Sequence, residues 1–200
     1  MTAKKLAESA ELKRRIRRLL AAIRSMATDM HLRGRDTHDS ASHLADRLNA
    51  LGRAAEASVF SGKDLEMLVL DELLAHGVER TAAVIDGPSV RLNAKSAELM
   101  TLVVHELATN AIKFGALSQP LTQLRVVWWF KGSAEERLHF EWAEIGVQMG
   151  AMQSQSPGFG SQVVKRLIAR ELNGDGKMAF LPGGVLCTIE IPATEALLNT

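Results

Sequence analysis

This chain of 200 residues has one cysteine, no apolar run long enough to span a membrane, and almost no net charge. A membrane-spanning helix needs about 20 consecutive apolar residues. Cys187 has no second thiol for an internal disulfide, and its strand-like surroundings favour a small, buried, apolar role. The net charge of +1 argues against a strongly polyanionic partner. Because no secretory signal peptide opens the chain either, we expect a cytoplasmic protein that does not bind a membrane.

The first part of the chain has the pattern of a helical hairpin. Residues 3–30 carry apolar side chains three and four positions apart, residues 31–39 break the pattern, and a second amphipathic helix follows. A single hairpin leaves much of its apolar face uncovered, so we expect two copies to form a four-helix bundle in a homodimer. The apolar positions of the first helix are Leu12, Ile16, Leu19, Leu20, Ile23, Met26 and Met30.

The rest of the chain mixes helical and strand patterns. We therefore predict an α+β protein with two domains, a helical hairpin over residues 1–60 and an α/β sandwich over residues 61–200, in which helices pack on one face of a mixed sheet. Helices are predicted over 61–75 and 159–172. A third predicted helix begins at residue 97 and includes the run that the next paragraph describes. Strands are predicted over 81–85, 90–92, 124–130, 138–144, 177–180 and 185–191, with a loop over 145–157.

Residues 105–118, HELATNAIKFGALS, form the most informative run. Helical spacing places Glu106, Asn110 and Lys113 on one face of a helix that is otherwise apolar. An Asn oxygen suits Mg²⁺, a lysine ammonium suits phosphate, and a glutamate can orient or deprotonate a bound water. The alternative is a polar seam beside the core with no ligand.

The same run resembles the nucleotide-binding N box of bacterial sensor histidine kinases, in the form found in the HWE family. The family is named for the histidine of this box and a later W-x-E, which here are His105 and Trp142-Ala143-Glu144. The resemblance covers roughly residues 8–192, and several ordered motifs make it more specific than a lone glycine signature. The other matching segments are RLNALGRAAE (47–56), GPSVRL (87–92), PGFGSQVVKRLIARELNG (157–174) and GGVLCTIEIP (183–192).

The resemblance implies an ATP-binding domain of the histidine kinase, gyrase and chaperone type, with ATP and Mg²⁺ as ligands. Asn110 would ligate Mg²⁺, with Glu106, the candidate catalytic residue, and Lys113 assisting. His105, Glu144, Gly146, Gly158 and Gly160 complete the predicted cofactor-binding set, Glu144 at the adenine amino group and the last two glycines at phosphate. From residue type alone, Glu144 could equally be an exposed glutamate at a strand end, and His105 a packed helix histidine.

Two segments depart from the family pattern. Where the family continues W-x-E-x-G-G-P, this chain has Val147 and Gln148 after Gly146, and the added Cβ of Val147 would crowd a close backbone approach to a ligand. The first helix reads ELKRRIRRLLA (11–21) against the acceptor pattern E-L-x-H-R-x-K-N-x-L-A, so Arg14 stands at the histidine position and Arg18 at the asparagine position.

A guanidinium cannot replace the acceptor imidazole. Its pKa lies above ~12, so at neutral pH it offers no lone pair to phosphorus. Autophosphorylation at Arg14 is therefore predicted to be absent. The histidines near the hairpin turn, His31, His38 and His43, could accept phosphate instead, although exposed turn histidines are the simpler interpretation.

The arginine cluster of the first helix, Arg14, Arg17 and Arg18, has two interpretations. It is either a solvated basic face or a surface that holds the acidic phosphorylation pocket of a receiver domain. The length leaves room for neither an input nor a receiver domain, so we expect a stand-alone pseudokinase of two-component signalling that binds a response regulator or a partner histidine kinase. The alternatives are an active kinase that phosphorylates another histidine or acts in trans, and, ranked last, nucleic-acid binding through the basic helix.

Overall fold

The computed structural model describes residues 63–132, 135–148 and 163–198. The chain divides into two compact units, residues 1–51 and 52–200, and every described residue belongs to the second. The predicted helical hairpin, its arginine cluster, the three turn histidines, and Gly158 with Gly160 lie outside the described residues.

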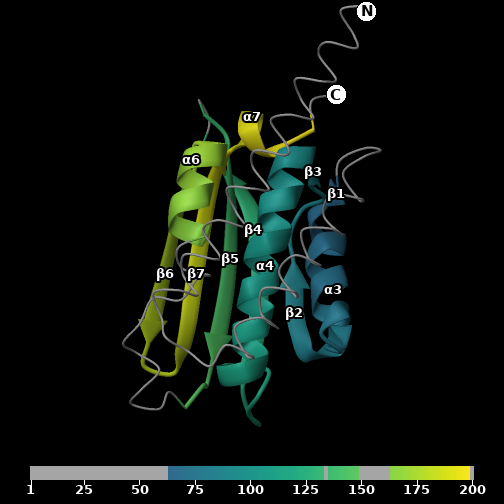
Figure 1. The fold of residues 1–200 in the computed structure, drawn as a ribbon, viewed down its shortest axis with the longest axis vertical. Coiled ribbons are helices and arrows are strands. Elements are labelled where there is room, and N and C mark those ends of the chain that lie inside the picture. Colours follow the sequence, from purple (N-terminus) through teal and green to yellow (C-terminus); the bar gives the residue numbers. More distant parts are fainter. Residues whose placement is uncertain (1–62, 133–134, 149–162, 199–200) are drawn as a thin grey trace, which may run out of the picture. The chain divides into compact units, whose positions relative to one another are not determined.

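The described unit alternates helices and strands (Figure 1). Its helical elements are α3 (Leu65–Ala75), η1 (Arg80–Ala82), α4 (Ala94–Phe114), η2 (Val163–Leu167), α6 (Ile168–Leu172) and α7 (Ala193–Ala196). Its strands are β1 (Lys63–Asp64), β2 (Ala83–Asp86), β3 (Arg91–Leu92), β4 (Gln123–Lys131), β5 (Arg137–Ile145), β6 (Asp175–Leu181) and β7 (Gly184–Pro192).

Five strands form one mixed sheet in the order β2-β4-β5-β7-β6, in which β2 pairs parallel with β4 and the other neighbours are antiparallel. Helices α3, α4 and α6 lie in front of this sheet in Figure 1, on one of its faces. The predicted mixed sheet with helices on one face is therefore confirmed. The small antiparallel pair of β1 with β3 is an addition that the sequence pattern did not predict.

The core lies between the sheet and α4. Helix α4 is long because most of it is buried. This helix begins after Asn93, whose side chain accepts a hydrogen bond from the Ser96 backbone N–H at 2.9 Å. Nearly every residue from Ser96 to Ala108 is buried, so tertiary packing rather than one apolar stripe holds the helix in place. No helix in the described ranges is long and apolar enough to cross a bilayer.

Several predicted boundaries were wrong, and for two of them the structure gives the cause. The first helix of this unit begins at Leu65 rather than at residue 61, because Asp64 is its N-cap and accepts from the Met67 N–H at 3.2 Å. The strand predicted over 81–85 begins at Ala83, where its parallel pairing with Leu124 starts, and a 3-10 turn precedes it. At the end of α6, Asn173 takes the left-handed conformation (φ 51°), as expected of a C-terminal cap.

The tryptophans of β4 and β5 lie on two faces of the sheet. Trp128 and Trp142 are buried and pack in the core, whereas Trp129 is 40% exposed and stacks on His139 at 5.4 Å between ring centroids. Period-two alternation along β4 places neighbouring tryptophans on opposite faces. Cys187 is fully buried, and burial raises the pKa of its thiol to about 12, so it stays protonated as an apolar core residue.

Candidate nucleotide site

The polar stripe of α4 runs from the core to the surface. Glu106 is buried, whereas Asn110 and Lys113, one and two turns further along, are exposed. Helical spacing of three and four residues keeps all three on one side of the helix. The exposed carboxamide and ammonium lie within the last two turns of α4, where a ligand can reach them from solvent.

Glu144 is not the exposed strand-end glutamate that the alternative interpretation of the sequence required. Its side chain is buried at the end of β5, and one carboxylate oxygen accepts from the Ala116 backbone N–H at 2.8 Å. The other oxygen accepts from the Trp142 indole N–H at 3.1 Å. A Cβ at Gly115 would lie 1.8 Å from Glu144 Oε2, so only glycine lets the carboxylate reach the backbone that follows α4.

Burial raises the pKa of the Glu144 carboxyl above its ordinary value, and the hydrogen bonds from Ala116 and Trp142 oppose that effect. The folded protein therefore binds this proton more tightly than the unfolded chain does. The stabilisation is complete below the ordinary carboxyl pKa and is lost as the pH rises through the folded-state pKa. The ionised carboxylate remains in place because two N–H donors face it.

We expect Glu144→Gln to destabilise the protein by about 1–3 kcal/mol, because the amide leaves one of the two buried donors without a good acceptor. The difference from the native chain should shrink as the pH rises, because glutamine never carries the buried charge. Urea titrations at several pH values between roughly 4 and 8 measure both effects.

The matched control is Glu141→Gln on the same strand, which removes a partner of Arg125 on the sheet surface. That change should alter stability by less than about 1 kcal/mol. A stability difference between Glu144→Gln and the native chain that is the same at every pH would contradict a raised pKa of the buried Glu144 carboxyl.

The segment after β5 contacts and hydrogen-bonds to the loop after α4. Gly146 has φ +81°, and a Cβ there would lie 3.0 Å from the Leu121 carbonyl oxygen, so this position favours glycine. Two residues later, the Gln148 N–H donates to Gln119 Oε1 at 2.9 Å. With the Glu144 contact to Ala116, these interactions join two loops at one end of the sheet beside the exposed end of α4.

Val147, the departure from the family pattern, has a buried side chain, and its backbone N–H donates to the Gly183 carbonyl at 2.9 Å. Its Cβ is therefore accommodated within the protein. We conclude that the valine, which stands where the family pattern has glycine, serves internal packing at this position.

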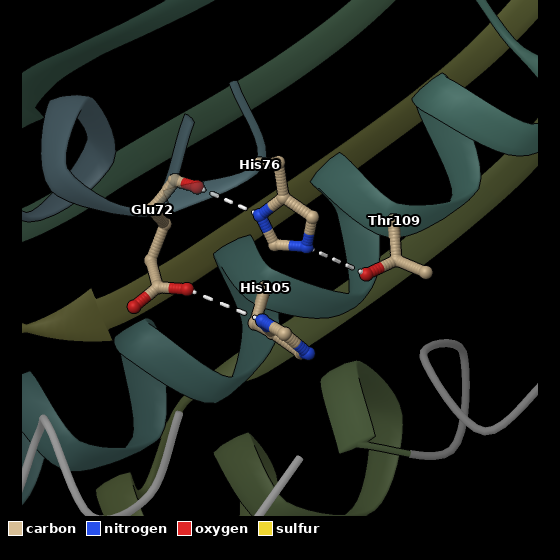
Figure 2. Close-up of polar contacts among 4 residues, drawn as sticks. All are labelled: Glu72, His76, His105 and Thr109. Carbon is tan, nitrogen blue, oxygen red and sulfur yellow. Dashed lines mark hydrogen bonds and ion pairs between the residues drawn. The ribbon is translucent and has the colours of Figure 1, made fainter. Parts of the chain in front are cut away.

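His105 lies on another side of α4, between α4 and α3 (Figure 2). Its Nδ1 is 3.2 Å from Glu72 Oε2, its ring centroid is 4.9 Å from that of His76, and it is 4% exposed. This is the arrangement of a packed helix histidine. Sequence reasoning missed Glu72 and His76; the available signal was their spacing of four residues, which brings a carboxylate and an imidazole to one face at the end of a helix.

The described residues fit a magnesium nucleotide in their chemistry. An exposed carboxamide oxygen suits Mg²⁺, an exposed ammonium suits phosphate, and a fixed carboxylate suits an amino group. The structure brings Gly146 and Glu144 together at the end of β5 and places Asn110 and Lys113 at the end of α4. His105 lies apart, against α3.

Comparison with protein families matches residues 11–89 to the model described as HWE histidine kinase. Among individual proteins, the chain is 27% identical over 196 residues to blue-light-activated histidine kinase 1 of Erythrobacter litoralis, covering 94% of this chain and 53% of that protein. It is 25% identical over 198 residues to the blue-light-activated histidine kinase of Brucella ovis, covering 96% of this chain and 40% of the relative. The chain thus spans about half the length of these relatives or less.

Solved structures give the same fold. The Erythrobacter litoralis EL346 blue-light-activated histidine kinase superposes with a TM-score of 0.59 at 15% identity, covering 92% of this chain and 60% of the other. Its isolated histidine kinase domain superposes with a TM-score of 0.52 at 16% identity, covering 89% of this chain and 95% of the domain. The mixed sheet with helices on one face is therefore part of a fold that this chain shares with solved histidine kinases.

Proposed function

We propose that this chain, a homologue of the HWE-family histidine kinases, acts in two-component signalling without a phosphoacceptor histidine at the usual position. It binds a response regulator or a partner histidine kinase, and bound Mg-ATP sets its conformation rather than phosphorylating its own first helix. The observation that carries this proposal is Arg14 in the acceptor register, with Glu11 and Leu12 before it and Arg15 after it in family positions.

The chemistry of Arg14 supports the proposal because transfer to nitrogen needs a lone pair aligned with the γ-phosphorus. Guanidinium delocalises its electrons over three nitrogens and keeps its proton at neutral pH. The direct test is incubation with γ-labelled ATP, with Arg14→His as the matched variant, and its expected result is argued in the Discussion.

For the nucleotide, we assign roles to the residues at the ends of α4 and β5. Mg²⁺ would neutralise phosphate charge; Asn110 would hold it through its side-chain oxygen, and Lys113 would contact phosphate. Glu144 has lone pairs beyond the two that it uses for Ala116 and Trp142, so it can also accept from an adenine amino group. Glu106 is assigned as the buried carboxylate on the same helix face as Asn110 and Lys113. His105 would position α4 through its packing on α3.

The basic cluster Arg14, Arg17 and Arg18 would hold the acidic pocket of a receiver domain without transferring phosphate. Changing all three to glutamine should lower capture of the host's purified receiver domains severalfold, and raising the salt should weaken capture by the native chain. The matched control changes Lys165, Arg166 and Arg170 to glutamine, which removes the same charge from exposed positions of η2 and α6. Equal loss in the two triple variants would contradict a specific docking surface.

A further inference from the structure

We propose that Glu72, His76 and His105 form a binding site for a divalent transition-metal ion, with Zn²⁺ as the best chemical match, at the interface of α3 and α4. One ligand atom from each of the three side chains lies within 4.8 Å of the others. Glu72 lies on α3, His76 is the C-cap residue that follows this helix, and His105 comes from α4 (Figure 2). The cluster shares only His105 with the residues assigned above, as a residue that packs α4 on α3, and the metal proposal does not depend on nucleotide binding.

Burial makes this cluster different from an ordinary surface group of acidic and histidine residues. The Glu72 side chain is 2% exposed and that of His105 is 5% exposed. Within this buried pair a divalent cation would engage the Glu72 carboxylate and both imidazoles at once, since the ring of His76 is packed against that of His105.

The ring of His76 is already oriented as a ligand. Its Nδ1 donates to the Glu72 backbone carbonyl at 2.8 Å, which places the proton on Nδ1 and leaves the lone pair on Nε2. Histidines that bind metals are commonly held by such a bond from the other ring nitrogen to a backbone carbonyl. The Nε2 atom is 3.1 Å from Thr109 Oγ1, so its lone pair faces α4 and accepts from that hydroxyl when no ion is bound.

The distances between the ligand atoms of the three side chains suit a small ion. Two ligands bound at about 2.0–2.1 Å in tetrahedral geometry lie roughly 3.3 Å apart. Glu72 Oε2 and His105 Nδ1 are 3.2 Å apart, close to this edge length. The ligand atoms all lie within 4.8 Å of one another, and the longer separations would have to shorten by rotation of the side chains when an ion binds. The Thr109 hydroxyl or a water then takes the fourth position.

Ligand chemistry selects the metal. Two imidazoles and one carboxylate match the His₂Glu sets of zinc sites, whereas Mg²⁺ and Ca²⁺ prefer oxygen ligands. A bound ion would join α3 to α4 five residues before Asn110, because His105 and Asn110 lie on the same helix. Binding should therefore raise the thermal stability of the folded unit.

The test uses the full chain, freed of metal with a chelator and then titrated with Zn²⁺ alone and, separately, with Co²⁺. We expect a stable one-to-one site and, with Co²⁺, the intense visible absorption of a four-coordinate ion. Glu72→Gln and His76→Gln should each weaken Zn²⁺ binding at least about tenfold. His139→Gln is the matched control, because His139 lies on β5 beside Trp129 and Glu190, away from the cluster.

Because histidines outside the described residues can also bind Zn²⁺, the comparison between variants decides the result. Equal affinity in the native chain, Glu72→Gln and His76→Gln would overturn the proposal. The Co²⁺ spectrum of the native chain is a second measurement that needs no variant to fold, and a spectrum typical of six-coordinate, solvent-exposed Co²⁺ would overturn the proposal as well. Loss of binding in His139→Gln equal to that in the cluster variants would also contradict it.

Discussion

Incubation with γ-labelled ATP and Mg²⁺ at neutral pH should leave the native chain without acid-labile phosphate, whereas Arg14→His should acquire it. Histidine offers a neutral ring nitrogen with a lone pair near pH 7, and guanidinium does not, since its pKa lies above ~12. The difference between the two chains should therefore be all or none rather than graded. The measurement is label that survives base and is lost in acid.

A second variant improves the test. The family pattern has asparagine where this chain has Arg18, so Arg14→His together with Arg18→Asn should be labelled at least as strongly as Arg14→His. Arg17→His is the matched control, because it adds a histidine to the same predicted helix at a position where the family has no acceptor. Equal labelling of Arg17→His and Arg14→His would show that position does not matter and would contradict the register on which the proposal rests.

Acid-labile label on the native chain would defeat the pseudokinase proposal and support the rival, an active kinase that uses another histidine. In that case, glutamine at His31, His38 and His43 in turn would identify the acceptor. Label found only when a second histidine kinase is added would point to action in trans between different protomers.

Asn110→Ala should weaken Mg-ATP binding by roughly 100-fold or abolish its heat in a calorimetric titration, because the change removes the predicted oxygen ligand of Mg²⁺. Asn110 is exposed on α4, so the substitution should leave the core and the thermal stability almost unchanged. The loss can then be assigned to the site rather than to unfolding.

Asn110→Asp serves as the positive control, since it has the same shape and keeps an oxygen ligand that Mg²⁺ accepts. It should retain binding, and it should retain a requirement for Mg²⁺. Equal heats for the native chain and Asn110→Ala would remove Asn110 from the nucleotide site, and with it the assignments of Glu106 and Lys113 that depend on the same helix face.

Several parts of the fold were predictable from the sequence because their signals are local. Alternation over residues 124–130 and 138–144 predicts the β4–β5 hairpin, and the structure extends each strand by only one residue at each end. Asn173 and Gly174 mark the end of α6. The start of α3 was missed because Ser61 and Asp64 are both good caps, and pairing of Asp64 with Arg91 in β3 decides between them.

The sequence by itself determined which chemical groups the chain carries: an arginine in the acceptor register, and a carboxamide and an ammonium spaced along one helix. Only the tertiary structure decided where two other side chains point. Glu144 turns inward because Gly115 admits its carboxylate, and His105 turns to α3 because Glu72 lies there. Periodicity gives the angle of a side chain around its own helix or strand, but the partner at that angle comes from residues distant in sequence, and no local pattern encodes it.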